Sequence, residues 1–190
     1  MREPSPQSIR AEALEALLIE KGFLKAEDVD QVILRYGERV GPLNGAQVVA
    51  RAWVDDQFRE DLLNDGSAAI ASYQFEGGQV EKLVVVENTA TVHNVVVCTL
   101  CSCYPWALLG LPPKWYKDPE YRSRVVKEPR KVISEMGFDL AAGTSVKVWD
   151  SSAEIRYLVL PQPPENLQSY SEDDLVALVS RDGMIGVAER

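Results

Sequence analysis

The sequence predicts an α+β fold, in which a helical N-terminal arm precedes a strand-rich core with helices packed on its outer faces. Two patterns indicate this fold: residues 1–65 carry apolar residues at helical spacing, and short runs of β-branched residues follow from residue 82 onward. A chain of 190 residues with 46% hydrophobic content can bury one core with an appended arm. We therefore expect two domains, residues 1–65 and residues 66–190.

Three helices are predicted in the N-terminal arm. Ser8 is the expected N-cap of the first helix, which ends at Gly22, and the second ends near Gly41-Pro42. The third is expected from Gly45 to Asn64. The first two helices carry thin apolar stripes, formed by Ile9, Ala13, Leu14, Leu17 and Leu18 and by Val29, Val32, Ile33 and Tyr36. Two interpretations stay open: the arm packs within the chain, or it wraps around a partner subunit.

The remaining sequence predicts strands that alternate with helices. Strands are expected at Lys82–Glu87, Val92–Val97, Ser145–Trp149 and Ile155–Leu160. Because only Asn88-Thr89-Ala90 and one further residue separate the first two strands, we expect them to pair as a hairpin-like unit. Helices are expected after Asp118-Pro119, from Glu128-Pro129 to Gly137, and from the cap residue Ser171 to about Ser180.

Charge and hydropathy exclude several classes of protein. The formal net charge is −9 and basic residues form no large cluster, which argues against nucleic acid or an anionic membrane as the main partner. No segment approaches the ~20 apolar residues that cross a bilayer. The N-terminus lacks the apolar core of a signal peptide. These features, with thiols that must stay reduced to bind metal, predict a cytoplasmic protein.

The cysteines carry the strongest functional signal. Cys98, Cys101 and Cys103 directly follow a predicted strand and are the only cysteines in the chain. Soft thiolates at C-x2-C-x-C spacing predict a metal site, whereas an odd number argues against a disulfide framework. Structural zinc and iron–sulfur sites usually take four protein ligands. His93 is more often a structural histidine than a ligand, so further ligands would come from carboxylates, water or the backbone.

The backbone offers one such set of ligands. The amide nitrogens of Ser102 and Cys103 lie between the sulfurs of Cys101 and Cys103 along the chain, so that S–N–N–S could chelate in one plane. Cys98 would then bind from one axial side and leave the sixth position open, as a catalytic site requires. Amide deprotonation needs a strongly polarising metal, such as trivalent cobalt or iron.

The motif Cys98-Thr99-Leu100-Cys101-Ser102-Cys103 resembles the metal-binding motif of the nitrile hydratase α subunit. The resemblance covers most of residues 40–190 and includes Val86–Thr89, His93–Val97, Pro105-Trp106, Leu109–Lys117, Arg124–Val132, Arg156–Pro161 and Met184–Val187. It implies one cobalt ion (Co3+) per chain, held by Cys98, Cys101, Ser102 and Cys103. Thr99 resembles the cobalt type, and the alternative metal is iron (Fe3+).

The resemblance also implies the chemistry of the site. Cys101 would be a cysteine sulfinic acid and Cys103 a cysteine sulfenic acid, with Cys103 as the catalytic residue that acts on a nitrile to give an amide. Gln79 and Trp106 match residues of the substrate pocket. The partner implied is one or more nitrile hydratase β subunits in a hetero-oligomer. No Arg or Lys lies between Val84 and Leu111, so we expect positive charge near the oxidised sulfurs to come from elsewhere, and the resemblance implies the β subunit.

Two alternative functions remain. The catalytic subunit of thiocyanate hydrolase shares this motif, and Tyr104 resembles that enzyme, whereas Trp106 in place of an Arg suits a neutral nitrile better than an anion. A non-catalytic module that binds metal through the three thiols is the second alternative. Arg156 lies in a strand made for burial, so we expect it to have an ion-pair partner.

Overall fold

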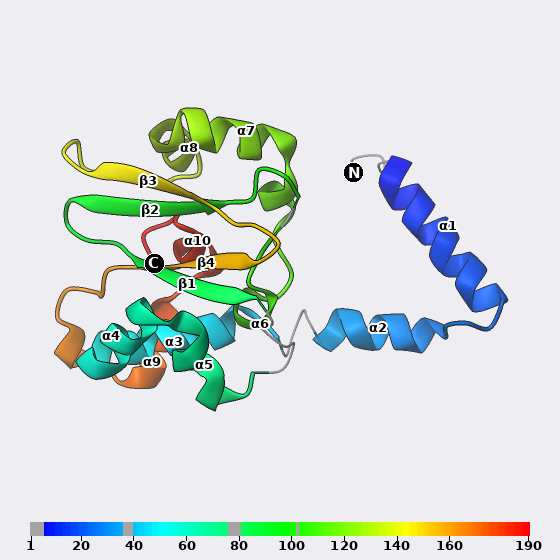
Figure 1. Ribbon diagram of the computed structural model, residues 1–190, viewed down its shortest axis with the longest axis horizontal. Helices are drawn as coiled ribbons and strands as arrows, with labels where there is room; N and C mark the ends of the chain where they lie inside the picture. Colours follow the sequence, from blue (N-terminus) through cyan, green and yellow to red (C-terminus); the bar gives the residue numbers. More distant parts are fainter. Residues whose placement is uncertain (1–5, 36–39, 76–80, 102) are drawn as a thin grey trace. The chain divides into compact units, whose positions relative to one another are not determined.

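The computed structural model describes residues 6–35, 40–75, 81–101 and 103–190 (Figure 1). Contacts divide the chain into two units, Met1–Arg39 and Val40–Arg190. This division differs from the expected boundary at residue 65. The reason is that the helix after Pro42 buries Val48, Val49 and Trp53 in the core of the second unit.

The first unit consists of α1 (Pro6–Glu20) and α2 (Ala26–Leu34). The predicted N-cap was wrong, because Ser8 lies inside α1. The predicted end was right: Gly22 has a φ of +73°, a left-handed conformation that glycine adopts at low cost. Tyr36, expected on the second helix, lies outside the described residues.

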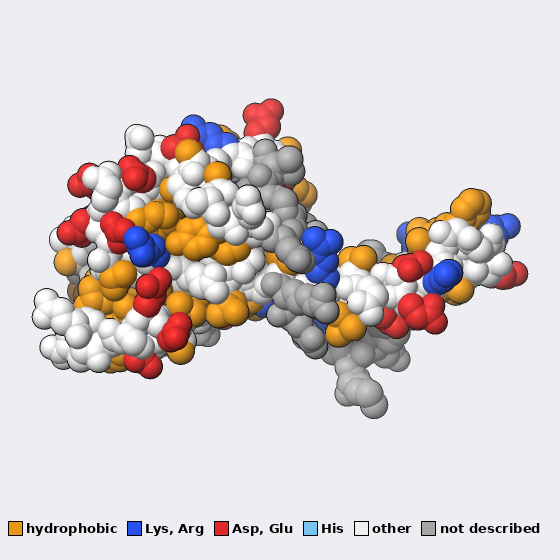
Figure 2. Space-filling view, turned by 90° about the horizontal axis from the view of Figure 1, so that it is seen from below, with side chains coloured by type: hydrophobic (Ala, Val, Ile, Leu, Met, Phe, Trp, Pro, Cys, Tyr) orange, Lys and Arg blue, Asp and Glu red, His pale blue; other side chains and the backbone are white. Residues whose placement is uncertain are grey.

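The apolar side chains of the first unit lie at its surface. Neither α1 nor α2 contains a buried residue. Figure 2 shows hydrophobic side chains exposed on this unit. The exposed set comprises Ile9, Leu14, Leu17, Phe23, Val32, Ile33 and Leu34. Both helices therefore hold apolar surface that the first unit itself does not bury.

The second unit combines helices and strands, as the predicted α+β class requires. Its helical elements include α3 (Pro42–Val54), α4 (Asp56–Asn64), α5 (Gly66–Ile70), η2 (Ala71–Tyr73), α6 (Trp106–Leu109), η3 (Lys114–Lys117), α7 (Pro119–Lys127), α8 (Pro129–Glu135), η4 (Leu167–Ser169), α9 (Glu172–Leu178) and α10 (Arg181–Ile185). Its strands are β1 (Lys82–Glu87), β2 (Val92–Val97), β3 (Ser145–Asp150) and β4 (Ile155–Leu160). No helix in the described ranges is long and apolar enough to cross a membrane.

The strands form two parallel pairs, and the predicted hairpin is wrong. β1 pairs with β4, and β2 pairs with β3. Every residue of β2 except Val92 is buried, whereas β3 has no buried residue. Near-continuous burial is typical of parallel strands that are covered on both faces. The apolar run of β2 was thus a signal for parallel pairing that the short connection to β1 obscured.

After β1, the Asn88 side chain forms hydrogen bonds with Asn94 where a hairpin would have backbone pairing. The Asn88 side-chain oxygen accepts hydrogen bonds from the Asn94 backbone N–H (2.7 Å) and from the Asn94 side-chain amide (3.1 Å). The Asn94 side-chain amide also donates to the Glu87 carbonyl at 2.7 Å. These bonds satisfy polar groups that are buried at the turn. Without a hydrogen-bond partner, such buried groups would cost free energy.

Helices lie on opposite sides of the strands. Buried residues of these helices and strands form one hydrophobic core. In Figure 1, α7 and α8 lie beside β3, while α3, α4, α5 and α9 lie beyond β1. The predicted single helix to Asn64 is interrupted, because Asp55 ends α3 and its side chain caps α4 by accepting from the Phe58 N–H. The Asp118 and Ser171 caps are confirmed. The short helix α10 was not predicted.

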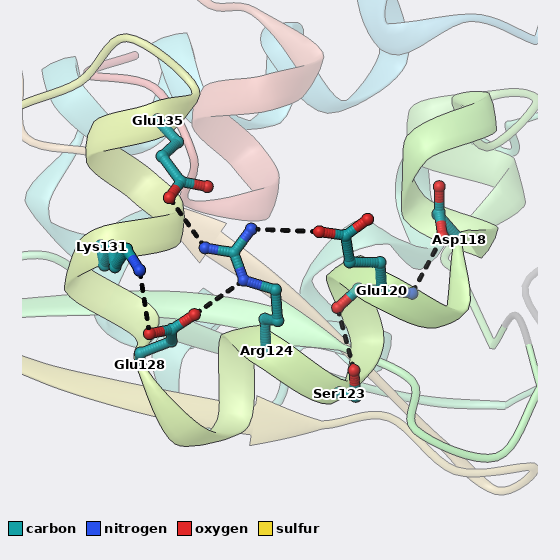
Figure 3. Close-up of polar contacts among 7 residues, drawn as sticks. All are labelled: Asp118, Glu120, Ser123, Arg124, Glu128, Lys131 and Glu135. Carbon is teal, nitrogen blue, oxygen red and sulfur yellow. Dashed lines mark hydrogen bonds and ion pairs between the residues drawn. The ribbon is translucent and has the colours of Figure 1, made fainter.

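An ion-pair cluster joins α7 to α8 on the outside of the unit. Figure 3 shows the Arg124 guanidinium between Glu120, Glu128 and Glu135, with Lys131 on the far side of Glu128. The shortest of these contacts, from Arg124 to Glu128, is 2.7 Å. The cluster links two consecutive helices and is accessible to water.

The only histidine, His93, has a structural role, as predicted. Its Nε2 lies 2.8 Å from the Gly186 carbonyl oxygen, and its Nδ1 lies 3.2 Å from the Asn88 side-chain nitrogen. A neutral ring that donates from Nε2 and accepts at Nδ1 satisfies both contacts. Burial of the ring lowers the pKa of His93 below its usual value, and the bond to Gly186 opposes that shift.

This environment predicts a stability loss in mild acid. The folded-state pKa of His93 is lowered. Below about pH 6.5, His93 therefore binds a proton in the unfolded chain more readily than in the folded chain. The free energy of unfolding should therefore fall as pH decreases from about 7.5 to 5.5. Urea unfolding at several pH values tests this, with H93Q as the comparison; an equally steep pH dependence in H93Q would contradict the assignment.

Candidate metal centre

The three cysteine sulfurs converge on one loop after β2. Cys101 Sγ lies 3.4 Å from Cys98 Sγ and 3.0 Å from Cys103 Sγ, and all three sulfurs lie within 4.8 Å of one another. These separations exceed the ~2.05 Å of a disulfide bond. The backbone N–H of Cys101 also points to Cys98 Sγ at 3.3 Å. The loop therefore brings three soft donor atoms close together, as the C-x2-C-x-C spacing leads one to expect.

The three cysteines differ in their exposure to water. Cys98 and Cys103 are buried, whereas Cys101 is exposed. Burial, then hydrogen bonds in which the Cys103 thiol donates to the neighbouring cysteine sulfurs, raise the pKa of Cys103 to about 12, and the positive charge of Arg156 opposes the shift. In the absence of a metal the Cys103 thiol thus keeps its proton at neutral pH, and metal binding must release it.

The start of the loop is fixed to the end of β3. The Asp150 carboxylate accepts from the backbone N–H of Thr99 (2.9 Å) and from the Thr99 hydroxyl (2.5 Å). Parallel pairing explains this contact, because Val97 and Asp150 are register partners at the same end of β2 and β3. A threonine or serine at position 99 can make both bonds, which gives the hydroxyl residue of the motif a structural role.

The rest of the loop is held by side chains from downstream elements. The Arg122 Nη1 on α7 donates to the Cys101 carbonyl oxygen at 2.9 Å, and the Tyr116 hydroxyl donates to the Cys103 carbonyl oxygen at 2.9 Å. Tyr116 is fully buried. Backbone carbonyls of two cysteines are thus restrained by donors that lie outside the motif.

These restraints predict that Asp150 supports metal binding. In D150A the Thr99 N–H and hydroxyl lose their common acceptor, so the loop is no longer ordered around Cys98. We expect the affinity for cobalt to fall about 10- to 100-fold, the usual cost of losing a residue that orients a metal ligand. D139A, which removes a surface carboxylate bonded to Ser134, is the matched control and should bind cobalt like the wild type.

The other predicted site residues have different outcomes. Gln79 and Ser102 lie outside the described residues. Trp106 is the first residue of α6 and is 37% exposed, so its indole lies partly in solvent near the loop. Its role in a substrate pocket stays a prediction. Arg156 is buried and pairs with Glu81 at 2.6 Å, which confirms the expected ion pair.

Sequence reasoning missed the contributions of Asp150, Arg122 and Tyr116. The absence of basic residues between Val84 and Leu111 led us to expect positive charge from elsewhere, and Arg122 of this same chain supplies one cation at the loop. A capped helix at Asp118-Pro119 was predictable, but its position against the loop depends on tertiary packing. Only the adjacent strand end gave a local hint of Asp150.

Comparison with known proteins identifies the family. The family described as nitrile hydratase, alpha chain, matches residues 5–188. The low-molecular weight cobalt-containing nitrile hydratase subunit alpha of Rhodococcus rhodochrous is 50% identical over 179 residues, which cover 94% of this chain and 86% of that protein. Thiocyanate hydrolase subunit gamma of Thiobacillus thioparus is 39% identical over 199 residues, which cover 99% of this chain and 82% of that protein.

A solved structure extends the similarity to the fold. A double mutant of the Fe-type nitrile hydratase from Comamonas testosteroni Ni1 aligns with a TM-score of 0.87 at 38% identity, covering 98% of this chain and 91% of the other. The sequence match spans almost the whole chain and includes the loop on which the three sulfurs converge. The chain therefore belongs to the nitrile hydratase alpha chain family.

Proposed function

We propose that this chain is the metal-bearing subunit of a nitrile hydratase, which adds water to a nitrile to form the corresponding amide at a low-spin Co(III) centre. The observation that carries the proposal is the convergence of three cysteine sulfurs within 4.8 Å on a restrained loop. The cobalt assignment is supported by relatives at about half sequence identity that are named cobalt-containing.

The residues present fit such a metal. Three thiolates are soft ligands of the kind that cobalt, iron and zinc accept. In the described part of the chain, no His, Asp or Glu joins the cysteine cluster, so a tetrahedral zinc site of four protein side chains is not favoured. We propose that Cys98, Cys101 and Cys103 bind through sulfur and that Ser102 and Cys103 also bind through their amide nitrogens.

A trivalent cobalt bound here would act as a Lewis acid that polarises a nitrile or acidifies water. The chain's own residues supply the rest. We propose that Cys101 is a sulfinic and Cys103 a sulfenic acid, both products of thiolate oxidation. The Cys103 sulfenate oxygen would take a proton from a water that attacks the nitrile carbon, or would itself bond to that carbon; in the second route, water then cleaves the S–O–C linkage, which releases the amide and restores the sulfenate. In either case one water is consumed and one amide is formed.

The first unit supplies a surface for a partner subunit. Its helices leave apolar side chains exposed, among them Leu14, Phe23 and Ile33. Exposed apolar patches of this kind mark interaction sites. We propose that this arm binds a nitrile hydratase β subunit in a hetero-oligomer, and that residues of both subunits, with Gln79 and Trp106 from this chain, line the substrate pocket. A reducing cytoplasm would keep the thiols available before metal loading.

Hydrolysis of thiocyanate is the second candidate, and Tyr104 was the residue that favoured it. Tyr104 is only 2% exposed and its ring packs against Tyr116 with centroids 5.1 Å apart. Its burial against Tyr116 gives Tyr104 a packing role that either enzyme could use, so its identity is a weak discriminator between the two substrates. The partly exposed, uncharged Trp106 fits a neutral nitrile, and we therefore prefer nitrile hydration.

A substrate comparison tests this function. The full chain, produced with its partner subunit and loaded with cobalt, is assayed for amide formation from aliphatic and aromatic nitriles and for ammonia release from thiocyanate. We expect amide formation from a nitrile and at most slow turnover of thiocyanate. Turnover of thiocyanate alone would favour the second candidate. Tight cobalt binding without turnover of either substrate would favour a metal-binding module.

A further inference from the structure

Arg122 reaches the metal-binding loop from the helix α7. It lies in the first turns of α7, which begins at Pro119 behind the Asp118 cap. The neighbouring Tyr121 is buried, and its hydroxyl donates to the Val96 carbonyl oxygen of β2 at 2.9 Å. This bond fixes α7 to the strand that leads into Cys98. The guanidinium therefore reaches the Cys101 carbonyl oxygen from a helix that is hydrogen-bonded to β2.

The Arg122 guanidinium is partly withdrawn from water. Its side chain is half-buried, and its Nε is buried with no hydrogen-bond partner among the described residues. The bond to Cys101, at 2.9 Å, is also charge-assisted, a class that is stronger than neutral hydrogen bonds. Arg122 is thus suited to stabilise negative charge at this carbonyl.

The Cys101 carbonyl belongs to the peptide group that ends in the amide nitrogen of Ser102. If that nitrogen binds a metal without its proton, resonance places part of the negative charge on the carbonyl oxygen. We propose that Arg122 is a positioning residue of the metal centre, which holds this peptide group at its oxygen and stabilises the charge of its metal-bound form. This inference rests on the proposed function, because that function supplies the amide ligand.

The same contact restrains the spacing of the sulfurs. The carbonyl of Cys101 lies between the side chains of Cys101 and Cys103 along the chain, and the Tyr116 hydroxyl holds the next described carbonyl of the loop. The two donors thus restrain the carbonyl oxygens of Cys101 and Cys103. Loss of Arg122 should therefore weaken cobalt binding in two ways: it removes a positive charge, and it removes a restraint on the Cys101 carbonyl. Variants that keep or remove the charge separate these two contributions.

The experiment measures how firmly cobalt is held. Full-chain wild type, R122K, R122Q and R122M are loaded with cobalt in air, and cobalt loss is followed during challenge with a chelator. We expect cobalt loss to be about tenfold faster or more in R122Q and R122M, since a hydrogen bond to a charged group exceeds a neutral one by roughly this factor. R122K keeps the charge and should stay within about threefold of the wild type.

Arg124 provides the control on the same helix. It faces the outer cluster of Glu120, Glu128 and Glu135 (Figure 3), so R124Q should lose cobalt at the wild-type rate. Circular dichroism identifies any variant that fails to fold; if R122M does, R122Q and R122K carry the comparison. Cobalt loss from R122Q at the wild-type rate would overturn the role of Arg122.

Coordination of the wild type separates this inference from the proposed function. X-ray absorption at the cobalt edge distinguishes sulfur from nitrogen ligands. Sulfur and nitrogen ligands in the wild type, with faster loss from R122Q, are the expected result. Sulfur and nitrogen ligands with unchanged R122Q would overturn only the role of Arg122. Cobalt bound by sulfur without backbone nitrogen would overturn the proposed ligand set and this inference with it.

Discussion

Replacing Cys98 by alanine should abolish cobalt binding and nitrile hydration. Cys98 is fully buried at the end of β2, and its sulfur lies 3.4 Å from that of Cys101. Losing a residue that only orients a ligand costs about 10- to 100-fold in metal affinity, so losing the ligand itself should cost at least about 100-fold. Cobalt content after desalting and the rate of amide formation measure the effect.

Leu100 provides the matched control for this prediction. It lies in the same loop but is 90% exposed, and no described contact assigns it to the metal. L100A should therefore retain the cobalt content of the wild type. Thermal unfolding checks that C98A is folded. A folded C98A chain with wild-type cobalt content would show that the three sulfurs do not act as one site.

Replacing Gly186 by alanine should have the largest effect on stability. Gly186 follows α10 with a φ of +91°, which an alanine adopts only under strain. An added Cβ would overlap the Asn94 carbonyl oxygen and lie 2.9 Å from the Cα of Val95, both of them backbone atoms of the buried strand β2. Because β2 cannot move without disturbing the core, we expect a loss of at least about 3 kcal/mol in the free energy of unfolding.

Gly143 offers the comparison for this substitution. An added Cβ there meets no atom within 4 Å, and its φ is not positive. G143A should unfold within about 0.5 kcal/mol of the wild type, as surface substitutions usually do. Urea unfolding of the two variants measures the difference. Equal stability of G186A and G143A would contradict the packing of α10 against β2.

The metal-binding loop could be predicted from the sequence because its signal is local. Cys98, Cys101 and Cys103 fall within one short segment after an apolar strand, so the spacing alone restricts how far apart the sulfurs can lie. The residues that hold the loop could not be predicted in this way. Asp150 is 51 positions from Thr99, and Arg122 is 21 positions from Cys101. Their contacts depend on strand register and helix packing, which no short motif encodes.

The prediction of the strand pairing was wrong for a related reason. The sequence located all four described strands to within a residue at each end, because apolar β-branched runs are a local property. Pairing is not local: β1 pairs with a strand that follows it by more than sixty residues. The Asn88 side chain instead accepts a hydrogen bond from the Asn94 N–H, although an Asn in a short connection usually favours a hairpin.

The boundary of the helical arm was also mispredicted from local patterns. The pattern predicts one helix from Gly45 to Asn64, so nothing in it separates α3 and α4 from the arm. Asp55 interrupts this pattern by capping α4 through the Phe58 N–H, and α3 buries its apolar face in the second unit. Apolar stripes predict that a helix packs, but they do not identify the surface it packs against.

Elemental analysis combined with mass spectrometry of the Cys98–Cys103 peptide tests the central claim most directly. The account predicts about one cobalt per chain and about three added oxygen atoms on that peptide, two on Cys101 and one on Cys103. Zinc in place of cobalt, or three unmodified thiols after loading with cobalt in air, would contradict the proposed centre. The same sample then serves for the nitrile assay, so metal, oxidation and activity are read from one preparation.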